Sequence, residues 1–109
     1  MSAVQFFVGI DVSKDTLDVC VLPTGEAFTV SNDTAGIDEL LTRLRPMAPE
    51  RVVMEATGGY ETEAAATLLL GSFAVCVVNP LQVRNFARAD GQFAKTDRID
   101  AGVIAKFGE

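Results

Sequence analysis

Four carboxylates in this chain stand where their spacing suggests shared chemistry. Asp11 ends one apolar run and Glu55 ends another, while Asp97 and Asp100 stand three residues apart in the last predicted helix. A charge at the end of a buried strand is costly unless something pairs with it. We therefore expect the chain to be a scaffold that brings these four side chains to one place.

The chemistry expected of such a set is metal binding. Like charges this close repel, and one would take up a proton unless a cation were present. Two Mg²⁺ ions roughly 4 Å apart, bridged by carboxylates, are the arrangement used for phosphodiester chemistry. The chain has no histidine, which excludes histidine general bases, Ser–His triads and histidine zinc sites. Carboxylates instead favour hard cations such as Mg²⁺ or Mn²⁺.

A structural role is the alternative for each acid. Asp97 and Asp100 suit the first turn of a helix, where they interact favourably with its dipole. Asp11 suits the turn that follows its strand. Spacing alone leaves both interpretations open.

The elements that must position these acids alternate between strand and helix patterns. Apolar and alternating runs predict strands over 5–11, 16–22, 26–30, 51–54 and 73–78. Helical spacing predicts helices from the 31–34 cap to Pro46, over 61–70 and 81–88, and after a cap at Thr96. An antiparallel meander followed by βαβ crossovers gives an α/β fold, a mixed sheet with helices on its faces, which we assign as one domain, 1–109.

This arrangement makes the convergence of the acids specific. If the first and fourth strands are adjacent and parallel, Asp11 and Glu55 share one end of the sheet. Asp97 and Asp100 are three apart on a helix and should face the same way.

Net charge gives a mixed signal about partners. The chain carries −6 overall, but residues 1–79 balance at −7 and residues 80–109 at +1. Bound divalent cations would offset acidity near the site, so DNA is not excluded. The candidate phosphate or guide-RNA contacts are Lys14, Arg84, Arg88, Lys95 and Arg98. A solvated face with salt bridges is the alternative for these basic residues.

Other residues carry structural expectations. Cys20 and Cys76 lie in apolar runs and are expected to be buried free thiols. The segment 57–59, at a helix start, suits either a phosphate site or a plain tight turn. Tyr60 is expected to pack on the sheet rather than to stack on a base. No stretch is long enough for a membrane span and no signal peptide opens the chain, so a cytoplasmic location is expected.

Four motifs together carry a family resemblance. They are GIDVSK at 9–14, MEATGGYE at 54–61, NPLQVR at 79–84 and AKTDRIDA at 94–101. In this order they resemble the IS110/IS1111-type insertion-sequence transposases over nearly the whole chain.

The resemblance implies a RuvC-like, ribonuclease-H-type catalytic domain with a DEDD acid set. On this sequence the set is Asp11, Glu55, Asp97 and Asp100, with Glu61 the nearest rival to Glu55. It implies two Mg²⁺ or Mn²⁺ ions, DNA strand cleavage and transfer in recombination, a homo-oligomer and an element-encoded guide RNA. Family members also carry a second domain with a serine nucleophile, so the 109 residues alone are not expected to be active.

Two other functions fit parts of the same sequence. Gly9–Asp11 followed by a meander also suits the first phosphate loop of a sugar-kinase or actin-like nucleotide-binding fragment, which predicts ATP binding. A non-catalytic assembly module would carry the acids as surface decoration and leave them apart in space.

Overall fold

In the part of the chain that the structure describes, the sheet is mixed and has five strands. The computed structural model describes residues 4–89 and 100–109. The strands are β1 (Phe7–Val12), β2 (Thr16–Leu22), β3 (Glu26–Ser31), β4 (Arg51–Glu55) and β5 (Val75–Val78). Their spatial order is β3-β2-β1-β4-β5, with β1, β2 and β3 antiparallel and β4 parallel to both β1 and β5. The predicted meander and crossovers are confirmed.

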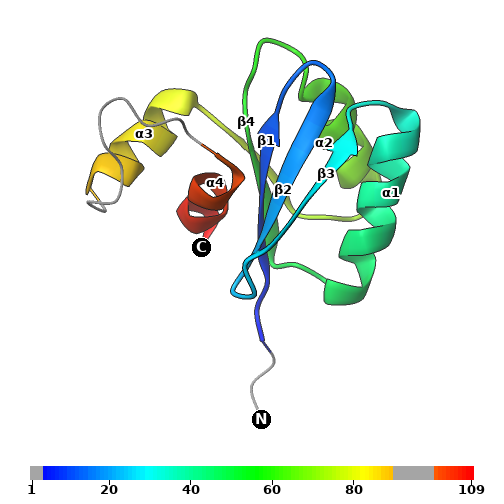
Figure 1. The fold of residues 1–109 in the computed structure, drawn as a ribbon, viewed down its shortest axis with the longest axis horizontal. Helices are drawn as coiled ribbons and strands as arrows, with labels where there is room; N and C mark the ends of the chain where they lie inside the picture. The colour runs from blue at the N-terminus through cyan, green and yellow to red at the C-terminus, as the bar shows by residue number, and fades with distance from the viewer. Residues whose placement is uncertain (1–3, 90–99) are drawn as a thin grey trace.

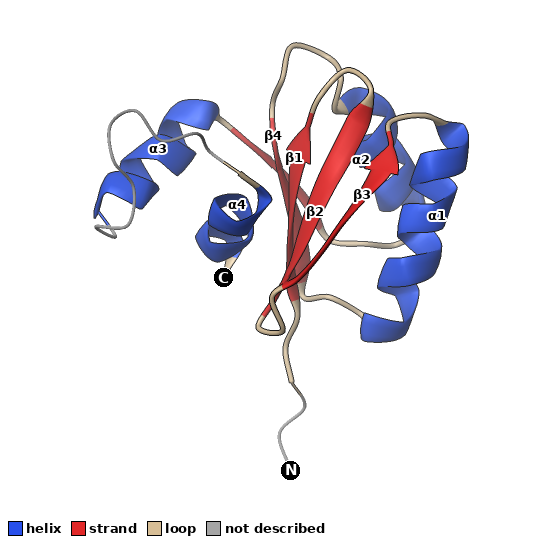
Figure 2. Ribbon diagram, viewed as in Figure 1, coloured by secondary structure: helices blue, strands red, loops and turns tan. Residues whose placement is uncertain are grey.

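Helices cover both faces of the sheet. In Figures 1 and 2, α1 (Thr34–Leu44) and α2 (Thr62–Leu70) lie on one face. On the opposite face lie α3 (Pro80–Ala89) and α4 (Ala101–Gly108). A 3₁₀ turn at Arg45–Met47, which contains Pro46, follows α1, as expected where proline blocks helix continuation.

Strand alternation divides the side chains between two cores. Val8 and Ile10 of β1 point toward α1 and α2, where they join the larger apolar cluster. The residues between them, Gly9 and Asp11, therefore point to the opposite face, where α4 lies. Val53 of β4 likewise joins the smaller cluster with Val83 and Ile104. The fold thus places Asp11 on the face of the sheet that α4 covers.

The capping chemistry of the helices matches their sequence signals. Asp33 caps α1 and accepts a 2.8 Å hydrogen bond from the Gly36 N–H. Asn79 Oδ1 accepts from Leu81 N–H at 2.7 Å, and Gln82 Oε1 accepts from Asn79 N–H at 3.4 Å. This reciprocal pair is a capping box, and it fixes where α3 begins.

The expectations about the start of the fifth strand and about the burial of the two cysteines were wrong. It begins at Val75, not at residue 73. Cys76 is exposed and Cys20 is only half-buried, although both were expected inside. Because β5 is an edge strand, its apolar residues are incompletely covered, unlike those of the interior strand β4.

In the part of the chain that the structure describes, no helix has the length and apolar character to cross a membrane.

Candidate functional site

Three acidic side chains lie in one row across the α4 face of the sheet. Asp11 of β1 is the direct antiparallel partner of Asp18 in β2. On its other side, the parallel register that pairs Ile10 with Met54 brings Asp11 beside Glu55. Asp11 and Glu55 thus lie near the carboxyl ends of neighbouring parallel strands, where ligands gather in α/β sheets.

Glu55 is the buried member of this row, with 9% of its surface exposed. Burial raises the pKa of its carboxyl group, and the nearby charge of Asp11 raises the pKa further. The guanidinium of Arg84 on α3 acts in the opposite direction. Asp11 and Glu55 are therefore close enough to repel each other, and a cation between them would relieve the repulsion.

Asp100, at the start of α4, lines a hollow that Asp11 also lines. It is the N-cap of that helix, with an extended backbone (φ −120°, ψ 178°), and its Oδ1 accepts a 3.0 Å hydrogen bond from Val103 N–H. Asp100 therefore precedes the helix, and the predictions that Thr96 caps this helix and that Asp100 stands within it were wrong. Thr96 and Asp97 themselves lie outside the described residues.

The position of Asp100 depends on how closely α4 packs on the sheet. Gly9 of β1 faces α4 directly, and a Cβ at this position would collide with the Ala101 carbonyl oxygen and the Ala105 backbone. At the other end of the helix, Gly108 lies against the Val53 side chain. Two glycines thus permit the close approach that brings the α4 N-cap next to β1.

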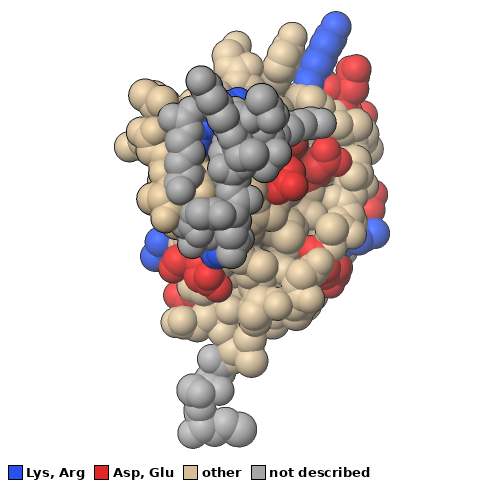
Figure 3. Space-filling model, turned by 60° about the vertical axis from the view of Figure 1, so that its left-hand side comes forward, with Lys and Arg blue, Asp and Glu red and all other residues tan. Residues whose placement is uncertain are grey.

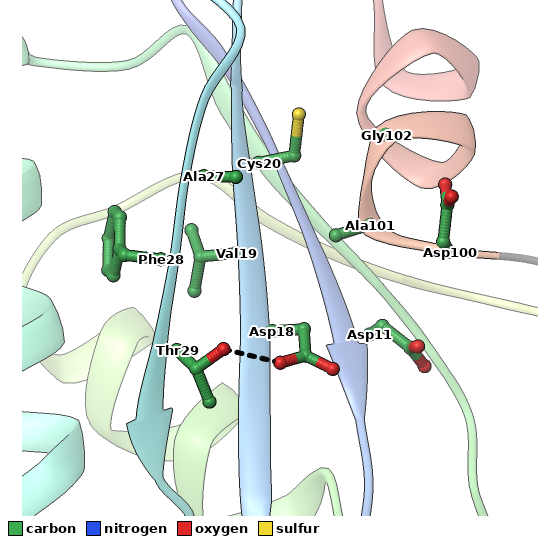
Figure 4. A pocket seen from close by; sticks show the side chains of 10 residues that line it. All are labelled: Asp11, Asp18, Val19, Cys20, Ala27, Phe28, Thr29, Asp100, Ala101 and Gly102. Atoms are coloured by element: carbon green, nitrogen blue, oxygen red, sulfur yellow. Dashed lines mark hydrogen bonds between the residues drawn. The ribbon is translucent and has the colours of Figure 1, made fainter.

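The acids border an open hollow of about 640 Å³, which we call the acidic hollow. Asp11, Asp18 and Asp100 line it together with residues of β2, β3 and α4, as Figure 4 shows. Asp18 accepts a 2.6 Å hydrogen bond from the Thr29 hydroxyl. Burial raises the pKa of the Cys20 thiol on the same wall, and the Asp100 charge adds to the shift.

Asp18 was missed as a site residue by the sequence analysis. The signal was present in the alternation of residues 16–22. Leu17 and Val19 are buried in the larger core, so Asp18 between them had to point to the face that carries Asp11.

Glu61, the alternative to Glu55 in the acid set, has a structural role instead. Its Oε1 accepts hydrogen bonds from Thr57 N–H at 2.9 Å, the Thr57 hydroxyl at 3.1 Å and Gly59 N–H at 3.1 Å. The bond from Thr57 N–H, the backbone N–H of Glu61 itself and the other two bonds lower the pKa of the Glu61 carboxyl to about 2. The backbone N–H groups that could have held a phosphate are occupied by this carboxylate, so the segment is a braced turn.

The predicted basic contacts are only partly described. Lys14 is exposed in the turn after β1, and Arg84 lies near Glu55 as stated above. The Arg88 side chain, Lys95 and Arg98 lie outside the described part of the structure. In Figure 3, acidic side chains reach the surface near the middle of the face and at several places toward its edges, and the basic ones lie at separate places.

The donor chemistry of the site fits a hard cation. Within residues 4–89 and 100–109, no three acidic or cysteine side chains are grouped closely enough to hold a metal ion. Asp11, Glu55 and Asp100 nevertheless supply oxygen donors from three elements on one face, and oxygen ligands are those that Mg²⁺ prefers.

The chain matches a known protein family and two relatives of similar sequence. The sequence model of the transposase family DEDD_Tnp_IS110 matches residues 8–109. The pilin gene-inverting proteins of Moraxella lacunata and Moraxella bovis are each 31% identical to the chain over 108 residues. Each alignment covers 94% of this chain and 34% of the relative, so the chain spans about a third of the length of these relatives.

A solved structure shares the fold. The structure of T. thermophilus RuvC in complex with a Holliday junction substrate superimposes on this chain with a TM-score of 0.63. The match covers 94% of this chain and 90% of that one at 17% identity. The architecture is therefore the RuvC-like, ribonuclease-H-type fold that the resemblance implied.

Proposed function

Because the chain belongs to the IS110-type DEDD transposase family, we propose that it is the metal-dependent catalytic domain of a DNA transposase. In this role it would serve DNA strand cleavage and transfer during insertion-sequence transposition. The observation that carries the proposal is the placement of Asp11 and Glu55 side by side at the carboxyl ends of β1 and β4, with Asp100 facing the same hollow as Asp11.

The proposed ligands are Asp11, Glu55, Asp97 and Asp100, and the proposed cofactor is a pair of Mg²⁺ or Mn²⁺ ions. When bound, such ions would activate the attacking oxygen and stabilise charge on the phosphate and leaving group. Of the proposed ligands, Asp11 and Glu55 lie on β1 and β4, and Asp100 is held by its N-cap hydrogen bond.

The surroundings of Glu55 support this role. A carboxylate with 9% exposure, set beside a second carboxylate, is costly in the absence of a cation. Arg84 offsets part of this cost in the chain alone. We propose that Arg84 neutralises the site rather than serving mainly as a DNA contact, and that Lys14, Arg88, Lys95 and Arg98 contact nucleic acid.

The proposed substrate is DNA, and branched DNA is the natural class. The related RuvC fold was solved with a Holliday junction substrate, and the relatives with 31% identity are named for gene inversion. Guide-RNA binding and homo-oligomer formation belong to the same proposal. The net charge of −6 means that bound cations or further protein must supply positive charge for tight DNA binding.

The nucleotide-binding alternative meets a physical obstacle at Gly9. In that alternative the Gly9–Asp11 segment would be a phosphate loop. Gly9 instead lies beneath α4, against the backbone of Ala101 and Ala105. A phosphate has no room there while α4 is docked.

Metal titration tests the proposed function. A ligand that binds only the folded state stabilises it by RT ln(1 + [L]/Kd). We expect the urea midpoint of the wild-type chain to rise with millimolar Mg²⁺ or Mn²⁺, and the rise to be lost in Asp11→Asn and Glu55→Gln.

Asp38→Asn is the matched control, since Asp38 is exposed on α1 across the sheet. This variant should respond to metal as the wild type does. Equal metal responses in wild type, Asp11→Asn and Asp38→Asn would refute the proposal and favour an assembly module.

A further inference from the structure

The turn between β4 and α2 presents an exposed aromatic ring at the carboxyl end of β4, the strand that carries Glu55. Tyr60 is 50% exposed, which corrects the expectation that it packs on the sheet. It follows Glu55 by five residues and stands at the same carboxyl end of the sheet. An aromatic side chain that is half exposed at this position is available to a partner.

The backbone that carries the ring is held from two directions. On one side, Glu61 Oε1 accepts the three hydrogen bonds from Thr57 and Gly59 described above. On the other side, Asn32 Nδ2 donates to the Tyr60 carbonyl oxygen at 3.0 Å and to the Ser13 carbonyl oxygen at 2.9 Å. The turn is thereby fixed to the loop that follows β1, two residues beyond Asp11.

The glycines of the turn keep its outer side open. Gly58 (φ +75°) and Gly59 (φ +119°) adopt backbone conformations that favour glycine. A Cβ built on either would meet nothing within 4 Å. The space beside these two glycines, which directly precede Tyr60, is therefore open to a ligand.

The chemistry left free on this turn selects the kind of ligand. The N–H groups of Thr57 and Gly59 are occupied by Glu61, and the residues 56–60 include no basic side chain. The turn therefore offers little to a phosphate. It offers the face of a ring, and base–aromatic stacking is how proteins hold single strands without reading their sequence.

We propose that Tyr60 stacks on an unpaired base of the DNA strand that enters the proposed site. This inference rests on the proposed function, because only a DNA strand at the Asp11–Glu55 site brings bases to this rim. The ring would hold the nucleotide next to the cleaved phosphate and leave the choice of base free.

The composition of the chain provides a direct probe. Tyr60 is its single tyrosine and there is no tryptophan, so tyrosine fluorescence reports on this residue alone. In millimolar Mg²⁺, a short single-stranded oligodeoxynucleotide should quench the emission of the wild-type chain. An abasic oligonucleotide of the same length and charge should leave the emission unchanged.

Variants separate stacking from general surface effects. Tyr60→Phe should bind the oligonucleotide as tightly as wild type, measured by anisotropy of labelled DNA, because the ring face is kept. Tyr60→Ala should bind about tenfold more weakly, in line with stacking measured elsewhere. The control Leu70→Ala removes a side chain that is 88% exposed at the end of α2 and should bind normally.

The outcomes distinguish this inference from the proposed function. If the wild-type chain binds DNA but quenching is absent and Tyr60→Ala binds equally well, the stacking inference is wrong and the function stands. Equal quenching by the abasic strand also overturns stacking. If the wild-type chain binds no DNA while metal still stabilises it, the inference fails together with the DNA partner.

Discussion

Gly9 of β1 and Ala105 of α4 touch backbone to backbone, and this contact decides where Asp100 lies. A Cβ at Gly9 would come 2.7 Å from the Ala105 Cα and closer still to its nitrogen. Because α4 starts directly after Asp100, any outward movement of the helix would carry that carboxylate away from Asp11. The absence of a side chain at Gly9 therefore sets the position of Asp100 relative to Asp11.

Gly9→Ala is expected to lower the free energy of unfolding by at least about 3 kcal/mol, at the upper end of overpacking costs, because the atoms in the way belong to the backbone. Urea denaturation measures the loss, and hydrogen exchange should show faster opening of the α4 amides. Gly71→Ala is the matched control, since its Cβ would meet mainly the flexible end of Leu41 at 3.1 Å. Equal stabilities for the two variants would show that α4 is free to shift.

Glu55 should make the metal-free chain lose stability as pH rises. Burial and the Asp11 charge raise its pKa above the usual 4.5 in the folded state. The unfolded chain therefore releases this proton first. Below pH 4.5 the Glu55 carboxyl is protonated in both the folded and the unfolded state, and it does not change the free energy of unfolding. That free energy falls as the pH rises from 4.5 through the folded-state pKa.

Glu55→Gln should remove this decline, so that the variant gains on the wild type between acidic and neutral pH in metal-free buffer. The measurement is the urea-derived free energy of unfolding at a series of pH values. Glu50→Gln, at an exposed position before β4, is the control and should follow the wild type. Parallel curves for wild type and Glu55→Gln would contradict the assigned environment.

Asp18→Asn should stabilise the metal-free chain. Asp18 stands directly opposite Asp11 in an antiparallel pair, and like charges in that position are destabilising by about 0.2–1 kcal/mol. The asparagine oxygen can still accept from Thr29. The gain should shrink in high salt. Asp15→Asn, in the exposed turn, serves as control, and a loss of stability in Asp18→Asn would count against the row of charges.

The main architecture could be predicted because strong local patterns agreed with the tertiary arrangement. The apolar runs before Asp11 and Glu55 predicted two strands, and those strands are adjacent and parallel as the convergence of the acids required. The contact of Gly9 with α4 could not be predicted, because sequence gives no distance between a strand and a helix that begins some ninety residues later.

The remaining errors have local physical causes. Thr96 and Asp100 both suit a helix cap, and the accepted hydrogen bond from Val103 identifies Asp100 as the cap of α4. The backbone of Tyr60 is held by a hydrogen bond from Asn32, 28 residues away, a contact that no periodicity reveals. Cys76 stands in an apolar run of the sequence, but it lies on an edge strand whose side chains are incompletely covered by other elements.

Glu61 should stabilise the folded chain above pH 4.5 and lose that effect in acid. Its folded-state pKa is lowered to about 2 by the hydrogen bonds from Thr57 and Gly59. The contribution is therefore fully present above the unfolded value of 4.5 and disappears as the pH falls toward 2. Glu61→Gln should cost about 1 kcal/mol at pH 7, and the gap to wild type should close on acidification.

The control for that series is Glu26→Gln, at an exposed position in β3. A gap between wild type and Glu61→Gln that stays constant from pH 7 to pH 3 would mean that the carboxylate does not brace the turn in its charged form.

Asn32 should be the most sensitive polar residue at the carboxyl end of the sheet. Its amide donates to two carbonyl oxygens, those of Ser13 and Tyr60. In Asn32→Asp the carboxylate cannot donate, and it would face both oxygens with a negative charge. We expect Asn32→Ala to cost about 1–3 kcal/mol and Asn32→Asp to cost more at pH 7, with hydrogen exchange of the two loops accelerated in both. Asn85→Asp, at an exposed position of α3, should change little. If Asn32→Asp were as stable as wild type, the two loops would be held together by something other than this amide, and the rigid support proposed for Tyr60 would be lost with it.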